Sequence, residues 1–377
     1  MTTTSPTLNR RSFLQIAGGV TACVVLTGAA GGCAGVRRGD LLPIDSSDIP
    51  PRLVPQGASI LEWAALAPSS HNTQPWMMQI VDEATWRITL DPARYLPQVD
   101  PDGRESVVSL GAFLENLDRA AAACGYQAQM DVAGDNATDL TVEIRLTERR
   151  PSGEDLSPLK RRRTVKSGLD GRDLSSDDLA GLLDAWPGHV EFIPRTSPTG
   201  AAVADLAVAS MREQMSREAA RIEFANWVRL DRNDAERRRD GLTTEAMEIT
   251  GFAGWWVRTF MDHDDLISEG FGKKSVGKTA EQTREGAGWL LVRSDGESPS
   301  QRLEAGRGFQ RLGLNAATRG IGLHPMSQIL EESTGRTGLR HHLGQDHHVQ
   351  MLVRVGYKDS YPEPVSLRRP VSWFVHS

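Results

Sequence analysis

The sequence predicts a mixed α+β fold in which two degenerate halves of one unit are fused in tandem. Helical and strand-like patterns alternate along the 377 residues. An amphipathic helical pattern that ends in glycine and continues into an extended segment occurs twice, within residues 110–129 and 305–325. Because a fused pair is the covalent version of a two-fold dimer, we expect an internal pseudo-dimer and a monomeric chain.

Composition argues against two classes of protein. The net charge of −6 is mildly acidic, whereas nucleic-acid binding needs a concentrated basic face, so we expect no nucleic-acid partner. No internal run of 18 apolar residues occurs, so we expect no membrane span in the mature chain. The apolar content of 39% is sufficient for a packed core.

The N-terminus has the pattern of an export signal. Arg10 and Arg11 stand directly before Ser-Phe-Leu, and a Gly/Ala-rich apolar stretch follows, which predicts a twin-arginine signal peptide over residues 1–33. A linker over residues 34–56 comes next. We therefore expect export in the folded state to the periplasm. Cys33 follows small residues as at a lipoprotein cleavage site, but Ala30 stands where Leu is usual, so a lipid anchor on Cys33 stays open.

The cysteines predict a mature chain without disulfides. Cys23 and Cys33 lie in the signal, and only Cys124 remains, in a helical pattern where a small buried residue is expected. Packing alone must therefore hold the fold.

The first half, residues 57–158, combines helical spacing with strand-like alternation. Its long helix is expected over residues 106–126, because Gly125 can end it. The other predicted elements are a helix over residues 57–67 and strands over 76–81, 85–91 and 139–148.

The second half, residues 159–377, repeats this order. Ser175 or Ser176 can cap its first helix, and Gly320 and Gly322 stand at the end of its long helix. The predicted elements are a helix over 174–186, a strand over 189–194, one or two helices over 204–230, a strand over 288–295, a long helix over 305–325 and a last strand over 347–357.

Residues 240–287 interrupt the repeat. They contain Trp255, Trp256, Phe260 and Phe271 among glycines, which is too aromatic for a solvated linker. Two interpretations stay open: a lid-like insertion over a pocket, and an additional helical hairpin packed on the core.

Two polar stretches can carry chemistry. The run "PSSHNTQPW" at residues 68–76 places hydroxyl and amide side chains between a predicted helix and a predicted strand, and Trp76 is expected to anchor that strand in the core. The run "RRRTVKSG" at residues 161–168 offers guanidinium forks, a hydroxyl group and an ammonium group to an anion. Taken separately, each run also fits a plain alternative: a polar turn and a solvated basic segment.

Considered together, these stretches resemble the nitroreductase-like flavoproteins, which bind FMN at a dimer interface. "APSSHNTQPW" is similar to that family's polar motif, and "RRRTVKSG" to its phosphate loop. "GLHPMSQ" at residues 322–328 is similar to the segment along the flavin ring, and "LVRVGY" with "SLRRP" to the last strand and basic tail. The tandem arrangement resembles the Acg-type branch, in which two such halves share one chain.

The resemblance implies FMN as the cofactor and assigns its contacts by position. Those expected from the polar run are Pro68, Ser69, Ser70, Asn72 and Gln74. Those expected around the phosphate are Arg162, Arg163, Thr164, Lys166, Arg368 and Arg369, and those along the ring are Pro325, Met326, Ser327 and Gln328. It leaves the catalytic residues unknown. Many relatives carry an acid at the position of Ser327, so their preference for nicotinamide does not transfer.

The motifs divide between the halves in a way that implies one FMN site per chain. The first half has the polar run but no arginine loop, since residues 40–62 contain only Arg52. The second half has the arginine loop, but "LLDAWPGHVEF" replaces the polar run. We therefore expect one site built across both halves, and a degenerate second site.

Three functions fit these patterns. The first is an FMN-dependent oxidoreductase whose electron donor is NAD(P)H or, because export removes it from the cytoplasmic pool, a membrane or protein donor. The second is an FMN storage or sequestration protein with little turnover. The third is a structural lipoprotein with a relic site. An aromatic cover packed on the flavin would favour the second function, and an open, hinged cover the first.

A metal site is not expected. His341 and His342, and His347 and His348, form adjacent pairs without the spacing of zinc ligands.

Overall fold

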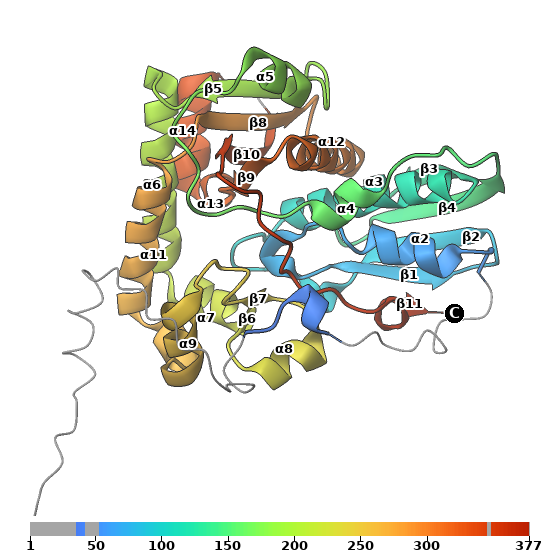
Figure 1. The fold of residues 1–377 in the computed structure, drawn as a ribbon, viewed down its shortest axis with the longest axis horizontal. Coiled ribbons are helices and arrows are strands. Elements are labelled where there is room, and N and C mark those ends of the chain that lie inside the picture. Colours follow the sequence, from blue (N-terminus) through green and yellow to red (C-terminus); the bar gives the residue numbers. More distant parts are fainter. Residues whose placement is uncertain (1–34, 42–52, 345–347, 377) are drawn as a thin grey trace, which may run out of the picture. The chain divides into compact units, whose positions relative to one another are not determined.

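The computed structural model describes residues 35–41, 53–344 and 348–376 (Figure 1). They belong to one compact unit that begins at Gly35. The predicted signal peptide with Cys33, and most of the predicted linker, lie outside the described residues. Of that linker, Val36 is buried against Ala235 and Leu367.

Two mainly antiparallel sheets organise the described chain. The first has the strand order β11-β1-β2-β4-β3, in which β11 and β1 run parallel, and the second has the order β5-β8-β10-β9. A short parallel pair, β6 and β7, stands apart. The strands are β1 (Trp76–Ile80), β2 (Thr85–Leu90), β3 (Tyr126–Ala133), β4 (Thr141–Glu148), β5 (Val190–Pro194), β6 (Val228–Arg229), β7 (Leu242–Thr243), β8 (Gly288–Ser294), β9 (Ile321–Pro325), β10 (His348–Tyr357) and β11 (Val375–His376).

Helices surround these sheets. The α-helices are α2 (Gly57–Ala64), α3 (Arg104–Ala123), α4 (Ser157–Arg161), α5 (Ser176–Leu183), α6 (Pro198–Ser216), α7 (Glu218–Asn226), α8 (Arg232–Arg238), α9 (Gly251–Phe260), α10 (His263–Ile267), α11 (Glu269–Gln282), α12 (Pro299–Thr318), α13 (Gln328–Glu331) and α14 (Ser333–Leu343). Short 3₁₀ turns are η1 (Arg38–Asp40), η3 (Ser70–Asn72), η4 (Pro92–Arg94) and η5 (Val371–Trp373). Ser175 caps α5, in agreement with one of the two predicted caps. No helix within the described residues is both long and apolar enough to cross a membrane.

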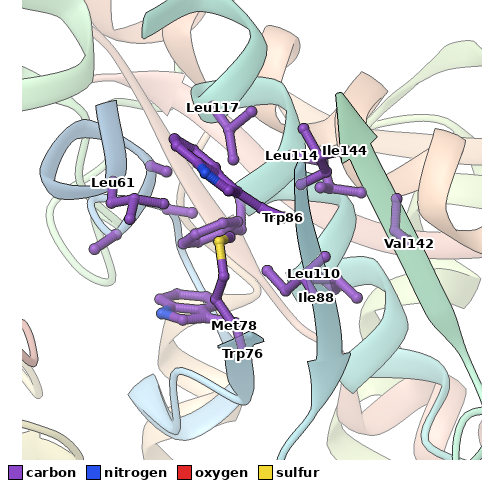
Figure 2. Packing of buried hydrophobic residues seen from close by; sticks show 14 of the residues in the cluster. Leu61, Trp76, Met78, Trp86, Ile88, Leu110, Leu114, Leu117, Val142 and Ile144 are labelled. Carbon is purple, nitrogen blue, oxygen red and sulfur yellow. The ribbon is translucent and has the colours of Figure 1, made fainter. Parts of the chain in front are cut away.

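The core of the first half lies between the first sheet and the helices α2 and α3. Figure 2 shows Leu110, Leu114 and Leu117 of α3, three and four residues apart, beside Trp86 and Ile88 of β2. These side chains are buried, and each stabilises the fold by about 1.5–3 kcal/mol relative to exposure. The alternation of β2, whose side chains are buried at every second position, matches the predicted strand.

The two long helices connect the sheets. α3 packs against β2 and β3 of the first sheet, α12 packs against β8, β9 and β10 of the second, and α3 and α12 pack against each other (Figure 1). The N-terminal half of α3 is thereby held beside residues that come from the second half of the sequence.

After β10 the chain returns to the first sheet. β11 pairs parallel with β1, with Met78 opposite Val375, and Phe374 is fully buried against Phe113. The strand predicted over residues 347–357 is present as β10, but the prediction that it is the last strand is wrong, because β11 follows it. A strand of two residues is too short to show alternation in a sequence.

The long helix of the second half differs from its predicted bounds. It begins at Pro299, where Ser298 and Gln301 form a capping box, and ends at Thr318. Gly320, with a φ of 69°, turns the chain out of the helix, as predicted. Gly322 lies in β9 and not at the helix end, because residues 321–325 pair with β10.

The insertion over residues 240–287 is mostly helical. It contains β7, α9, α10 and α11, and α11 packs along α6 while α10 packs against α7. Phe252 and Phe260 of α9 are 66% and 51% exposed, so the aromatic face of this helix is not buried in the core.

Candidate functional site

A cavity of about 270 Å³, here called the main cavity, is lined by residues from both halves of the sequence. The first half contributes the polar run and the N-terminal part of α3. The second half contributes the 162–166 loop, the segment after β9 and the C-terminal tail. The lining residues are Pro68, Ser69, Ser70, His71, Asn72, Glu105, Val108, Ser109, Ala112, Arg162, Arg163, Thr164, Lys166, Phe224, Leu242, Ala246, Phe309, His324, Pro325, Ser327, Met351, Val365, Ser366 and Arg368.

One end of the main cavity is strongly cationic. Arg162 is only 8% exposed, and no described residue accepts a hydrogen bond from its guanidinium group. Arg368 lines the same cavity, and Arg38 lies close behind, donating through Nε to the carbonyl oxygen of Ser366 at 2.9 Å. Burial lowers the pKa of all three arginines, and mutual repulsion lowers it further for Arg38, to about 10, and for Arg368. These charges therefore favour an anion in the cavity.

The 162–166 loop carries two more cations, Arg163 and Lys166, which differ in how far protein acceptors already engage them. Arg163 is fully engaged, because it donates to Glu248 at 3.1 Å and to the carbonyl oxygen of Glu363 at 2.6 Å. Lys166 lines the cavity, and burial is the main cause that lowers its pKa. The backbone N–H of Lys166 donates to Glu248, so the 240–287 insertion is anchored to this loop through one carboxylate.

The amides of the polar run hold the chain together. Asn72 donates to the carbonyl oxygens of Gly241 and Leu367, each at 3.1 Å, and accepts from Arg368 at 2.8 Å. Gln74, fully buried, donates to the carbonyl oxygen of Arg239 and accepts from the backbone N–H of Arg369. These two side chains therefore connect the first half to the insertion and to the tail.

Trp76 closes the run as expected. It is fully buried and packs on Phe113 with ring centroids 4.9 Å apart, so the prediction that it belongs to the core is confirmed.

Two neutral imidazoles also line the cavity. His71 has a left-handed backbone (φ 47°), its Nδ1 has no hydrogen-bond partner among the described residues, and burial lowers its pKa to about 4. His324 accepts at Nδ1 from Arg354 at 3.1 Å, because a guanidinium group can only donate. Burial holds the pKa of His324 well below its usual value, so its proton resides on Nε2.

Two carboxyl groups, the buried Glu105 and the half-buried Glu331, lie in the wall beside His71. Glu105 of α3 lines the main cavity and accepts from Arg104 at 2.8 Å. Glu331 of α13 lines a second cavity of about 160 Å³, here called the side cavity, which shares His71, Phe224 and Ser327 with the main one. The two carboxyl groups are hydrogen-bonded to each other.

The sequence model of the Nitroreductase family matches residues 159–357, more than half of the chain. The chain belongs to the nitroreductase family. Two proteins of Mycobacterium tuberculosis strain H37Rv, named "Putative NAD(P)H nitroreductase acg" and "Putative NAD(P)H nitroreductase Rv3131", are each 25% identical to it. Each alignment covers 84% of this chain, and 94% and 90% of the two relatives.

Solved nitroreductase structures are similar to about half of the chain. The FMN-dependent nitroreductase NfnB of Mycobacterium smegmatis, in complex with NADPH, is 16% identical with a TM-score of 0.34, over 54% of this chain and 90% of that one. A nitroreductase of Bacteroides fragilis with bound FMN is 14% identical with a TM-score of 0.30, over 54% and 87%.

In this nitroreductase-family chain, the main cavity brings together most residues that the sequence singled out. Those that line it are Pro68, Ser69, Ser70, Asn72, Arg162, Arg163, Thr164, Lys166, Pro325, Ser327 and Arg368. Four others do not. Gln74 and Arg369 bind each other, Met326 is buried in the core beside Leu352, and Gln328 lines the side cavity. A cofactor contact of these four therefore stays a prediction without support from the cavity.

Several residues in or next to the main cavity were not predicted from the sequence. Glu105 and Ser109 fall inside an amphipathic helix pattern and carry no motif of their own. Arg38 falls in the predicted linker. His71 was not among the predicted contacts, and its position inside the polar run was the one signal in the sequence.

The insertion contributes Leu242 and Ala246 to the main cavity and Phe271 to the side cavity. The aromatic residues of α9 line neither. Among the described residues no group of three or more His, Cys, Asp or Glu side chains is arranged to hold a metal ion.

Proposed function

We propose that this chain is an FMN-dependent oxidoreductase with one FMN bound in the main cavity. Membership of the nitroreductase family supports the class, and the chemistry of the lining supports the cofactor. The single observation that carries the proposal is Arg162, a buried guanidinium group that has no acceptor among the described residues and that lines the cavity. An unpaired buried charge costs several kcal/mol, and a bound phosphate would remove that cost.

The cavity residues fit the rest of FMN. Arg162 would grip the phosphate, with the hydroxyl group of Thr164 as a further donor. Arg368 would add its positive charge nearby, because its two terminal nitrogens already donate to Asn72 and to backbone carbonyl oxygens. Phe309, Met351, Val108 and other apolar side chains offer the walls that a flat ring needs. Ser70 and the N–H of His324 offer polar partners for the ring edge.

When bound, FMN would accept a hydride and pass electrons to an acceptor. The residues that line the main cavity would bind and orient the FMN, and would keep water from the face of the ring that packs against the cavity wall. Lys166 adds a positive charge to the cavity, and His71 and His324 remain neutral at neutral pH, so they add no second cation.

We further propose that the halves are degenerate copies and that the site is built across them. Each sheet packs against one long helix, and the tail after β10 returns to the sheet of the other half. The family model matches only the second half, which supports strong divergence of the first. A single chain would then suffice, and we expect a monomer by light scattering.

Two kinds of electron donor fit this chain. The mycobacterial relatives are named NAD(P)H nitroreductases, which supports NAD(P)H. Arg10 and Arg11 support export by the twin-arginine route, and Cys33 an optional lipid anchor, which together would favour a membrane or protein donor. Periplasmic fractionation of the wild type, of an Arg10→Lys/Arg11→Lys variant and of Cys33→Ala tests export and anchoring.

An absorbance spectrum of the purified protein, before and after anaerobic NAD(P)H, tests the function. A flavin band that bleaches supports an NAD(P)H-dependent reductase. A band that persists but bleaches with dithionite supports sequestration or another donor. Absence of flavin, even after reconstitution with FMN, would contradict the proposal.

A further inference from the structure

The wall between the two cavities contains a carboxylic acid bound to a carboxylate. Glu331 accepts from Ser327 Oγ at 2.6 Å and from the side-chain amide of Gln214, and it is hydrogen-bonded to Glu105. A hydrogen bond between two carboxyl groups requires a proton on one of them. Glu105 lines the main cavity and Glu331 lines the side cavity, so the hydrogen bond between them joins the two cavities.

The surroundings decide which oxygen holds the proton. Burial, followed by the charge of Glu105, raises the pKa of Glu331 well above its usual value. Burial would also raise the pKa of Glu105, but Arg104 and hydrogen bonds from Ser70 and Glu331 lower it on balance. Glu331 is therefore the acid and Glu105 the carboxylate at neutral pH.

Few of the charged groups around the pair act on it directly. The titratable or charged groups that face it are His71 of η3, Asp100 before α3, Arg104 of α3, Arg217 after α6, Glu332 after α13 and Arg336 of α14. Arg217 is paired with Glu332, His71 is neutral, and burial followed by the charge of Glu105 raises the pKa of Asp100 to about 6. Arg104 is thus the cation that acts directly on the pair.

We propose that Glu105 and Glu331 are a proton-transfer pair that carries protons from the side cavity to a substrate in the main cavity. The proposal rests on the proposed function, because the electrons come from the reduced cofactor and the pair supplies protons only. In one transfer the O–H bond of Glu331 breaks and an O–H bond forms on Glu105, so the negative charge moves to Glu331. Glu105 gives its proton to a basic oxygen or nitrogen of the reduced acceptor, and a proton from the side cavity restores Glu331.

The test uses Glu331→Gln, which keeps the shape of the side chain and, through its amide oxygen, the hydrogen bond from Ser327, but cannot release a proton. FMN binding is first measured by flavin fluorescence in the wild type and in each variant. If the wild type binds no FMN, the proposed function fails, and that result is distinct from the results below. Glu62→Gln, an exposed carboxyl group on α2, is the matched control.

The first readout needs no activity. The infrared spectrum of the wild type at neutral pH should contain the C=O band of a protonated carboxyl group, and Glu331→Gln should lose it while Glu62→Gln keeps it. Glu105→Gln, which leaves the Glu331 side chain in place, is the second variant and keeps the test valid if Glu331→Gln fails to fold. Glu105→Gln should bind FMN. Its residue 105 carries no charge, so the pKa of Glu331 should be lower than in the wild type. A wild type without this band would overturn the proposal.

The second readout is turnover. Oxidation of the reduced enzyme by an acceptor should slow roughly 10²–10⁴-fold in Glu331→Gln, as for loss of a general acid, and lose its solvent isotope effect. Glu62→Gln should match the wild type. If Glu331→Gln loses the infrared band but keeps the wild-type rate and pH profile, the pair only holds α13 to α3, and the proposal is wrong.

Discussion

Gly111 of α3 and Gly306 of α12 face each other where the two long helices cross. A Cβ atom added to Gly111 would lie 2.1 Å from the carbonyl oxygen of Leu303, and one added to Gly306 would lie 2.1 Å from that of Val108. No side chain fits between the backbones at this crossing. Val108 and Phe309, close to it on either helix, line the main cavity, so the close approach also sets the shape of the site.

We expect Gly111→Ala and Gly306→Ala to lower the free energy of unfolding by about 1–3 kcal/mol or more, because the methyl group must push backbone atoms apart. Urea unfolding measures the loss. Gly277→Ala is the control: it lies in α11 with open space around the added Cβ, and alanine should stabilise that helix by up to about 1 kcal/mol. Equal stability of Gly306→Ala and Gly277→Ala would show that the helices can separate without cost.

Arg162→Met should weaken FMN binding by about 2–5 kcal/mol, because it removes a buried partner of the phosphate. The stability of the cofactor-free protein should stay equal or rise, since a buried charge without an acceptor among the described residues is removed. Fluorescence titration and thermal unfolding measure the two effects. Arg161→Gln, at the neighbouring exposed position, should change neither. Unchanged FMN affinity in Arg162→Met would place the phosphate elsewhere.

Phe374→Ala should destabilise the protein by about 3–5 kcal/mol, because its fully buried ring packs on Phe113 and anchors β11. The same variant should weaken FMN binding, since the tail that carries Arg368 loses its anchor. Trp373→Ala, at a partly exposed ring one residue away, should cost clearly less. A similar loss in both variants would argue against a specific role of Phe374.

The neutral state of His71 makes stability depend on pH. Its pKa is about 4 in the folded protein and 6.5 in the unfolded chain, so only the unfolded chain takes up the proton between these values. The contribution of His71 to stability is therefore complete above about pH 6.5 and is lost as the pH falls toward 4.

His71→Gln should lack this loss, and the difference in unfolding free energy between wild type and variant should shrink as the pH is lowered through that window. Chemical unfolding at several pH values measures it. His341→Gln, at an exposed position of α14, should follow the wild-type curve. A constant difference between wild type and His71→Gln would mean that His71 has the same pKa in the folded protein as in the unfolded chain.

Several parts of the fold could be predicted from the sequence because they depend on neighbours along the chain. The alternation of residues 85–90, the cap at Ser175 and the glycine turn at Gly320 each act within one helical turn or one strand. For the same reason the polar run and the basic loop were recognised as candidate site segments: each is a local cluster of unusual composition.

Only the tertiary structure decided which distant parts of the chain those segments contact. Asn72 and Gln74 contact Leu367 and Arg369, almost three hundred residues away, and thereby hold the tail in place. Glu105 of α3 meets Glu331 of α13 across more than two hundred residues of sequence, and no sequence pattern in either helix predicts this contact. The sequence by itself determined where helices, strands and charged clusters lie, because these follow from local spacing. The fold decided which clusters converge, because burial and long-range hydrogen bonds between distant segments arise only when the sheets and helices have packed.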